Sequence, residues 1–350
     1  ITCRIGYLLV LMEQKIQNTR LDITPVFLSA SRRKKNPGDL LLTLLKIAED
    51  VRSDILLPAS CNLEGIEIGS KDLGDHRAAD AKTVTIQADH DCEQLVERSL
   101  RRLYPGSLVL GEEMFGKADP GQRQSMLQGA FVPGKTVFLV DALDGTRDFC
   151  AGNDGYAVMI AAMQDGKIKT VAVYRCTDHS DPAALGHTLA FSDDDCVRIN
   201  GKPLRLLSDR IFPSDPLKLR GYAGFEFITA MRGQNHFSFP DLTGKFDSVS
   251  DVFTASKLYA DILRGEHHFA LIPPPADLFD YPGGIALIQN AGGVAKFLDG
   301  APASFSEIVR RQPSSLGAAA AKTVENTLVF AVSEAVFKTV QKTVLGGSAP

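Results

Sequence analysis

The sequence carries three separated segments in which hydrophobic residues lead into carboxylates. They lie at residues 108–113 (LVLGEE), 137–146 (VFLVDALDGT) and 276–284 (ADLFDYPGG). In the first two, an aliphatic run ends at Glu112 and at the pair Asp141 and Asp144, and in the third Asp280 stands where a helix is expected to begin. Taken singly, each acid has an ordinary explanation as a solvated strand end, a turn or a helix N-cap.

The residues after Asp144 favour a binding site over three unrelated acids. If the chain turns helical near Thr146, the backbone amides of Gly145 and Thr146 point outward at a helix start, which is a site for an anion. Carboxylates a few Å apart repel one another by about 4 kcal/mol per pair at an effective dielectric constant of ~20. Mg²⁺ removes this repulsion and bridges carboxylates to phosphate. The pattern therefore indicates phosphoryl transfer to water, assisted by two or three Mg²⁺ ions.

The sequence does not indicate a zinc site. Its six cysteines are scattered without a CxxC pair, which is typical of reduced thiols and predicts a cytoplasmic protein. Glu266, His267 and His268 do not match the HExxH pattern, so we expect this histidine pair to face solvent.

Composition excludes two other classes of function. Lys plus Arg total 38 and Asp plus Glu total 42, for a net charge of −4, so no basic surplus points to a nucleic acid polymer. The longest apolar runs are far shorter than the ~18 residues that a membrane span requires. We therefore expect a small-molecule substrate and no membrane partner.

The helices and strands that must position the acids follow a different pattern in each half of the chain. In the first half, a helix from Asp39 and another after Asp89 accompany short strands joined by turns, which predicts an α+β half with an antiparallel sheet. The expected strands are 107–110, 136–140, 156–163, 170–174, 187–191 and 197–200. In the second half strands alternate with helices, which predicts an α/β half. The strands are expected at 217–222, 269–272, 294–298 and 328–331, and the helices at 252–264, 281–291 and 333–344.

The pattern of expected elements changes near residue 206, and this change predicts how the chain is divided. We expect an N-terminal extension at 1–37, loosely attached because it lacks a clear period and ends in a basic, polar run. Residues 38–205 are expected to form the metal-binding half. Residues 206–350 are expected to contribute the last metal ligand and the substrate specificity.

The motifs together resemble the inositol monophosphatase family, within the Mg²⁺-dependent, lithium-sensitive phosphatase superfamily. The resemblance rests on GEE, DALDGT and FD-x-x-GG with a trailing NAGG, in this order along the chain. Residues 83–89 and 197–203 are similar to two further family segments. The resemblance implies a layered αβαβα sandwich, a phosphoric monoester hydrolase acting on a small polyol or sugar phosphate, and a homodimer.

The resemblance also implies roles for individual residues. The implied metal ligands are Glu112, Asp141, the backbone carbonyl of Leu143, Asp144, Asp280 and Asp89. The implied catalytic residues are Glu112, Thr146 and Asp89, with Thr146 and one of the two acids orienting and deprotonating the attacking water. The amides of Gly145 and Thr146 would bind the phosphate, and Glu113 would support the ligands.

Three positions depart from the family pattern. Ala142 replaces the usual proline and Phe279 the usual tryptophan, and both changes keep the acids. Pro273 occupies the position at which inositol phosphatases place an acid that contacts the substrate. Proline offers no side-chain hydrogen bond, so the departure argues against inositol while leaving phosphate-ester cleavage intact.

Several alternatives stay open. The chain can be another member of the superfamily, acting on histidinol phosphate, fructose 1,6-bisphosphate or a 3′-phosphonucleotide. It can also be an inactive homologue that binds a phosphate ligand, although the complete set of acids argues against this. A haloacid-dehalogenase-type phosphatase is disfavoured, because that mechanism needs a nucleophilic Asp where this chain has Ala142.

Overall fold

The structure is a computed structural model that describes eleven stretches of the chain. These are residues 37–60, 68–71, 83–150, 155–175, 187–192, 196–224, 242, 244–251, 254–274, 276–312 and 324–345. Residues 1–36, which make up nearly all of the expected extension, lie outside the described residues. Pro37–Pro350 forms a unit of its own, to which all that follows refers.

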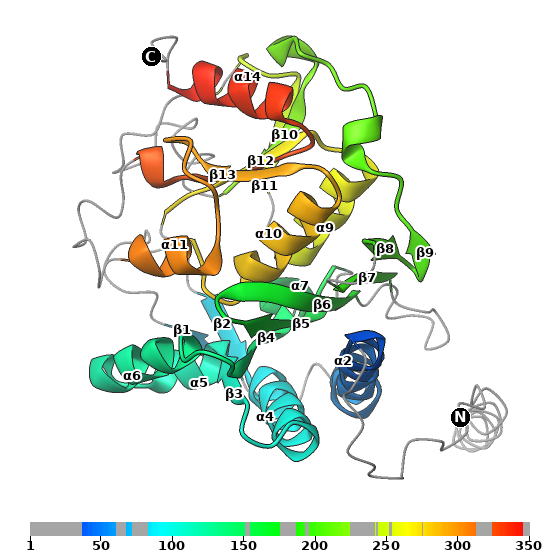
Figure 1. Ribbon diagram of the computed structural model, residues 1–350. Helices are drawn as coiled ribbons and strands as arrows, with labels where there is room; N and C mark the ends of the chain where they lie inside the picture. The colour runs from blue at the N-terminus through cyan, green and yellow to red at the C-terminus, as the bar shows by residue number, and fades with distance from the viewer. Residues whose placement is uncertain are drawn as a thin grey trace, which may run out of the picture. The chain divides into compact units, whose positions relative to one another are not determined.

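One sheet of this unit has seven strands (Figure 1), in the order β3-β4-β5-β6-β7-β8-β9. Its strands are β3 (Leu108–Gly111), β4 (Thr136–Asp144), β5 (Ala157–Gln164), β6 (Lys167–Arg175), β7 (His187–Ser192), β8 (Arg198–Ile199) and β9 (Lys202–Pro203). β3 runs parallel to β4 and every other pair is antiparallel. The predicted antiparallel sheet is therefore wrong at β3, because α5 (Glu112–Lys117) and α6 (Pro120–Ala130) carry the chain back before β4 begins.

Helices cover both faces of the seven-stranded sheet. α2 (Pro37–Val51) and α4 (Gln87–Leu103) contact one face, and α10 (Asp280–Asn290) contacts the other. Alternate residues of β4 and β5 belong to two different hydrophobic clusters, with Phe138 and Ile160 facing α2 and α4, and Leu139 and Met159 in the cluster that includes α10. Burial on both faces explains why these strands read as continuous hydrophobic runs.

A second sheet has five strands, in the order β11-β10-β12-β14-β13. Its strands are β10 (Arg220–Ala223), β11 (Ser248–Asp251), β12 (Phe269–Ile272), β13 (Val294–Phe297) and β14 (Leu328–Ala331). β10 pairs in parallel with β11 and β12, while β14 pairs antiparallel with β12 and β13. α10 also contacts this sheet and packs against α9 (Ala255–Arg264), and α14 (Glu334–Val344) contacts β12 and β14.

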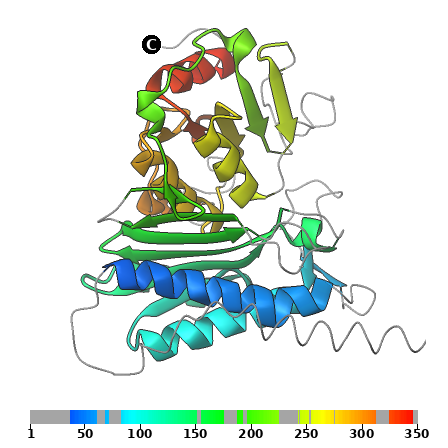
Figure 2. The same cartoon turned by 90° about the vertical axis from the view of Figure 1, so that its right-hand side faces the viewer.

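The layers therefore alternate as helix, sheet, helix, sheet, helix, and the predicted αβαβα sandwich is confirmed. Figure 2 shows α2 and α4 on one side of the first sheet and the α9–α10 layer on the other. The central helix layer lies between the sheets, and α10 contacts both of them. This placement decides where the acids can meet.

Several element boundaries differ from those predicted. α4 begins at Gln87, so Asp89 lies in its first turn instead of preceding it. Residues 216–218 form a 3₁₀ helix, η4 (Pro216–Lys218), so the strand expected from 217 begins at Arg220. β11 was not predicted, because its polar residues show no hydrophobic alternation.

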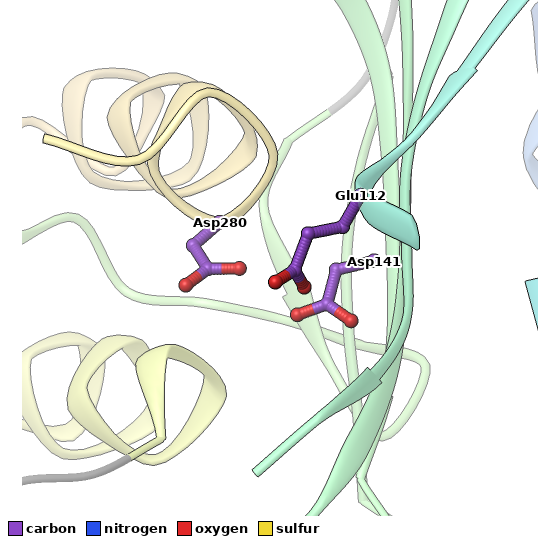
Figure 3. Close-up of side chains that lie close together, drawn as sticks. All are labelled: Glu112, Asp141 and Asp280. Atoms are coloured by element: carbon purple, nitrogen blue, oxygen red, sulfur yellow. The ribbon is translucent and has the colours of Figure 1, made fainter. Parts of the chain in front are cut away.

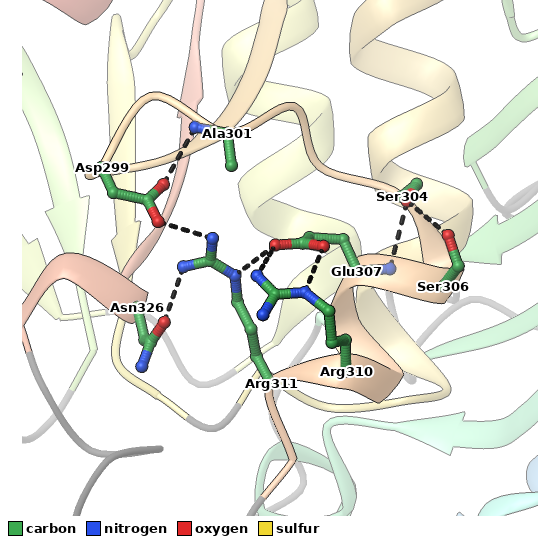
Figure 4. Close-up of polar contacts among 8 residues, drawn as sticks. All are labelled: Asp299, Ala301, Ser304, Ser306, Glu307, Arg310, Arg311 and Asn326. Atoms are coloured by element: carbon green, nitrogen blue, oxygen red, sulfur yellow. Dashed lines mark hydrogen bonds and ion pairs between the residues drawn. The ribbon is translucent and has the colours of Figure 1, made fainter. Parts of the chain in front are cut away.

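A polar network holds the corner beside α11 (Phe305–Arg310), as Figure 4 shows. The buried Arg311 guanidinium donates to Asp299 Oδ2 and to Asn326 Oδ1, each at 2.6 Å, and to Glu307 Oε1 at 2.7 Å. It also lies 4.0 Å from the Phe297 ring centroid. Because Arg311 is buried, each of these partners offsets the cost of removing its charge from water.

Smaller elements complete the described part of the chain. They are η1 (Arg52–Leu56), α3 (Leu57–Ser60), β1 (Ile68–Lys71), β2 (Thr83–Ile86), α7 (Thr146–Cys150), η3 (Leu207–Asp209) and η5 (Val324–Asn326). The division into halves at 38–205 and 206–350 stays a prediction. Within the described residues, no helix has the length and hydrophobicity needed to cross a bilayer.

Candidate active site

Three carboxylates from distant parts of the chain meet at one place (Figure 3). Glu112 is the first residue of α5, directly after β3, Asp141 lies in β4, and Asp280 is the first residue of α10. One oxygen of each carboxylate lies within 4.8 Å of the other two. The structure thus brings together one acid from each of the three segments that the sequence singles out.

The charges of this cluster oppose one another. Burial raises the pKa of the Asp141 carboxyl well above its ordinary value, and the nearby negative charges raise it further. Burial raises the pKa of Asp280 in the same way, and Asp277, Asp144 and Glu112 add to the effect. Asp280 Oδ1 is buried, and no hydrogen-bond partner for it is found among the described residues. Carboxylates that approach one another this closely fit a hard divalent cation.

Asp144 is placed differently from the other acids. It is 4% exposed, and its two oxygens accept hydrogen bonds from Ala255 N at 3.0 Å and Ser256 N at 2.8 Å, the first amides of α9. Burial raises the pKa of Asp144, while the hydrogen bonds from Ser256 and Ala255 lower it. Asp144 is not in the group of three, although its charge acts on Asp141 and Asp280.

The helix predicted after Asp144 begins at Thr146, as α7. Thr146 Oγ1 lies 3.1 Å from the Leu143 carbonyl oxygen and 3.4 Å from Asp89 Oδ2. The hydroxyl has one proton, which it can donate to only one of these acceptors at a time. It also has two lone pairs, with which Oγ1 can accept a hydrogen bond from another donor. Asp89, in the first turn of α4, is 3% exposed and lies outside the group of three.

Gly145 is required at this turn for two reasons. Its φ of +86° lies in the left-handed region that side chains other than glycine rarely adopt. An added Cβ would also overlap the Thr254 side chain and approach Tyr156 Cα to 3.2 Å. A residue with a side chain at position 145 would therefore disturb the turn that places the amides of Gly145 and Thr146.

An irregularity in β4 separates the two acids of the second segment. The register between β4 and β5 shifts between Asp141 and Asp144, and Asp141 Oδ1 accepts a hydrogen bond from Leu143 N at 2.9 Å. Such an interruption re-aims side chains that would otherwise alternate along the strand. The strand expected at 136–140 extends to Asp144, so Asp141 and Asp144 both lie within β4.

Sequence reasoning missed one residue that orients Asp280. Asp277 Oδ1 accepts hydrogen bonds from Phe279 N at 2.7 Å and Asp280 N at 3.3 Å, which directs the chain into α10. The available signal was an Asp two residues before Phe279, the N-cap of α10, because Asp at such a position typically starts a side-chain turn. The α9 amides that bind Asp144 carried no such signal.

The histidine pair expected to face solvent does not do so. His268 is 7% exposed, and its Nδ1 accepts a hydrogen bond from Arg220 N. His267 stacks on the Tyr222 ring at a centroid distance of 4.0 Å. The expectation was wrong because the pair leads directly into the buried strand β12 and lies beside β10.

The three residues that depart from the family pattern are all buried or half-buried. Phe279 is 7% exposed and meets the Phe115 ring edge-on, at a centroid distance of 5.5 Å. Ala142 is buried within β4, and Pro273 is half-buried directly after β12. Phe279 therefore packs against α5, the helix that begins at Glu112, as a larger aromatic residue would.

Comparison with known proteins decides the family. Residues 55–336 match the inositol monophosphatase family. The chain belongs to the inositol monophosphatase family. Membership confirms the predicted family and, with it, the enzyme class, since its members are phosphatases.

Individual relatives of this family are distant in sequence. The fructose-1,6-bisphosphatase/inositol-1-monophosphatase of Thermotoga maritima is 19% identical over 230 residues, which cover 64% of this chain and 75% of that protein. The inositol-1-monophosphatase of Mycobacterium leprae is 36% identical over 127 residues, or 35% of this chain and 40% of that protein. The crystal structure of the extragenic suppressor protein suhB from Bartonella henselae has a TM-score of 0.63 at 16% identity, covering 88% of this chain and 99% of that one.

Proposed function

We propose that this protein is a Mg²⁺-dependent phosphomonoesterase that hydrolyses a small polyol or sugar phosphate by direct attack of water. The observation that carries the proposal is the meeting of Glu112, Asp141 and Asp280 within 4.8 Å of one another. These acids lie in segments that the family uses for phosphate-ester cleavage. The repulsion among them is offset by divalent cations, and two or three Mg²⁺ ions are proposed.

In this proposal, Glu112, Asp141 and Asp280 hold the ions, with the carbonyl of Leu143 and the acids Asp144 and Asp89 completing their surroundings. When bound, Mg²⁺ neutralises the charge of the phosphate and of the attacking and leaving oxygens. The carboxylates of the chain would hold the ions beside the phosphate. Asp277 and the α9 amides support them by fixing the backbone at Asp280 and by holding Asp144.

Thr146 orients the attacking water in this proposal. Its Oγ1 accepts a hydrogen bond from the water, and its hydroxyl donates a hydrogen bond to Asp89 Oδ2 or to the Leu143 carbonyl oxygen. The water's proton passes to Asp89 or Glu112. The amides of Gly145 and Thr146, at the start of α7, donate to the phosphate oxygens.

The substrate alcohol is proposed at the level of class. Pro273 offers no hydrogen bond where inositol phosphatases place an acid, which favours a polyol or sugar other than inositol. One relative, a histidinol-phosphatase of Mycobacterium tuberculosis, is 34% identical over 104 residues, which places histidinol phosphate among the substrates to test. The homodimer, lithium sensitivity and cytoplasmic location implied above stay predictions.

The experiment is a phosphate-release assay over a panel of small monoesters, with Mg²⁺ or with EDTA. The panel contains inositol 1-phosphate, histidinol phosphate, fructose 1,6-bisphosphate, several sugar phosphates and a 3′-phosphonucleotide. We expect Mg²⁺-dependent turnover of at least one member, and its loss in Asp141→Asn. Asp247→Asn, which changes an exposed acid far from the cluster in sequence, is the matched control and keeps its activity.

Folded protein that turns over no ester, yet binds Mg²⁺ and a phosphate ester, would instead support the ligand-binding homologue. A phosphorylated aspartate trapped during turnover would contradict direct attack by water, because that mechanism forms no covalent intermediate.

A further inference from the structure

Glu93 is a buried acid that the proposed mechanism does not use. It lies on α4, is 6% exposed, and its carboxylate faces the start of α5. Oε2 accepts a hydrogen bond from Glu113 N at 2.7 Å, and Oε1 accepts one from Met114 N at 2.8 Å. These amides are the second and third of α5, which are the ones that the side chain of an N-cap residue normally accepts from.

The residue at the N-cap of α5 cannot make these bonds itself. It is Gly111, which has no side chain, and no side-chain cap is formed from that position. The carboxylate of Glu93 therefore takes the place of a local cap from a different helix. Its negative charge also lies at the positive end of α5, where the helix dipole favours it.

The contact with Glu93 explains why residue 111 is a glycine, whereas the backbone conformation does not require one. Its φ of −105° and ψ of 153° are extended values that any residue adopts. An added Cβ, however, would overlap Cδ, Oε1 and Oε2 of Glu93. The glycine before Glu112 therefore leaves space for the carboxyl group that caps the helix.

The contact joins two parts of the candidate active site. Asp89 and Glu93 are four residues apart on α4 and so lie on the same face of that helix. Asp89 approaches Thr146, while Glu93 holds the turn that begins with Glu112. Both oxygens of Glu93 are occupied by amides and Glu93 is outside the group of three acids, so the geometry does not make it a fourth member.

We infer that Glu93 is a positioning residue for Glu112: it caps α5 from α4, through the space left by Gly111, and so fixes the Glu112 carboxylate for metal binding. This inference rests on the proposed function. Partners that orient metal ligands typically contribute about 10–100-fold to metal affinity. We therefore expect loss of Glu93 to weaken metal binding by roughly 10-fold or more.

The test is a cycle of four proteins: native, Glu93→Ala, Gly111→Ala and the double variant. Mn²⁺ binding to metal-free protein is followed by electron paramagnetic resonance without substrate, with Mg²⁺ as competitor, and melting temperatures are recorded in EDTA. We expect each single variant to bind Mn²⁺ at least 10-fold more weakly than native. In the Glu93→Ala background, Gly111→Ala should have almost no further effect, because the space is then empty.

Two controls separate positioning from general destabilisation. Val96→Ala removes a fully buried side chain from the same helix, so it lowers the melting temperature but should leave Mn²⁺ affinity unchanged. Glu97→Ala removes the next acid along α4, which pairs with Arg101 on the same helix. Glu93→Gln keeps one acceptor oxygen and, if Glu93→Ala does not fold, is compared with native protein alone, because its side chain still fills the space beside Gly111.

Three outcomes can be told apart. If native protein binds no Mn²⁺, the proposed function fails. If native protein binds it and Glu93→Ala or Glu93→Gln binds it equally well, the positioning role is wrong while the proposed function stands. If Gly111→Ala has the same effect in both backgrounds, its glycine does not serve Glu93, and the inference is overturned.

Discussion

At the scale of single residues, the site is a set of acids that the fold holds against their own repulsion. Asp280 shows this most directly, since it enters from α10 and its Oδ1 is buried without a hydrogen-bond partner among the described residues. Burial and the charges of Asp277, Asp144 and Glu112 raise its pKa well above the ordinary value. Its ionised form therefore costs folding free energy until a cation offsets the charge.

The variant Asp280→Asn should separate stability from metal binding. At pH 7.5 it removes a disfavoured charge, so the metal-free protein should melt higher, by roughly 2 °C for each kcal/mol recovered. Mg²⁺-dependent activity should fall by about 10²-fold or more, because an intended ligand is lost. Melting curves in EDTA and phosphate-release rates measure the two effects. A metal-free variant that melts below native protein would show that the Asp280 charge is not destabilising.

At the scale of elements, the site is built from helix starts. α5, α7 and α10 begin at Glu112, Thr146 and Asp280, and the first amides of α9 bind Asp144. The first amides of a helix have no partner within the helix, and the positive end of its dipole lies there, so a helix start favours carboxylates and phosphate. The helices are in turn held by side chains at their ends, and α11 shows how pH acts on such a contact.

Glu307 on α11 provides a pH-dependent stability contact. Its bonds to Arg310 and Arg311 lower the pKa of Glu307 to about 2 from an ordinary 4.5. Because the folded pKa is the lower one, the stabilisation is present above pH 4.5 and is lost as the pH falls from 4.5 toward 2. Arg310 is exposed to solvent, so we expect only about 1 kcal/mol from this effect.

Glu307→Gln should therefore lose less stability than native protein between pH 5 and pH 3. Urea unfolding at several pH values measures this, and Glu334→Gln, which breaks the exposed pair with Lys296, is the control with little effect at any pH. Parallel pH curves for native protein and Glu307→Gln would contradict the role of this carboxylate.

At the scale of the whole described unit, the site depends on both sheets and on the helix layer between them. Glu112 and Asp141 belong to the seven-stranded sheet and its adjoining helix, whereas Asp280 begins the helix that contacts both sheets. An ion bound by all three acids binds only the folded arrangement. It should therefore stabilise the fold by mass action, by about 2.7 kcal/mol at a concentration 100 times its dissociation constant.

Mg²⁺ should therefore protect segments that are far apart in sequence. In hydrogen exchange, peptides containing the first turns of α5 and α10 should be slowed by Mg²⁺, relative to EDTA, by more than those of α6 and α14. Asp141→Asn should abolish the difference. Protection of the α5 peptide without the α10 peptide would mean that Asp280 does not share the ion.

Much of this arrangement could be foreseen from local pattern. Aliphatic runs that end in acids predicted strands before Glu112 and Asp141, and the start of a helix was predicted at Asp280, because alternation and turn chemistry are properties of short stretches of chain. The ordered motifs predicted the family and the αβαβα layers. The proximity of the three acids is observed, and their roles stay predictions until tested.

Contacts between distant segments could not be foreseen in this way. The parallel pairing of β3, the burial of His268, the α9 amides on Asp144 and the Glu93 carboxylate over Gly111 each depend on which surfaces meet after folding. A chain pattern records which face of an element is hydrophobic, but not which neighbour covers it. A buried acid such as Glu93 therefore looks like any helical glutamate until the helix that it caps is packed beside it.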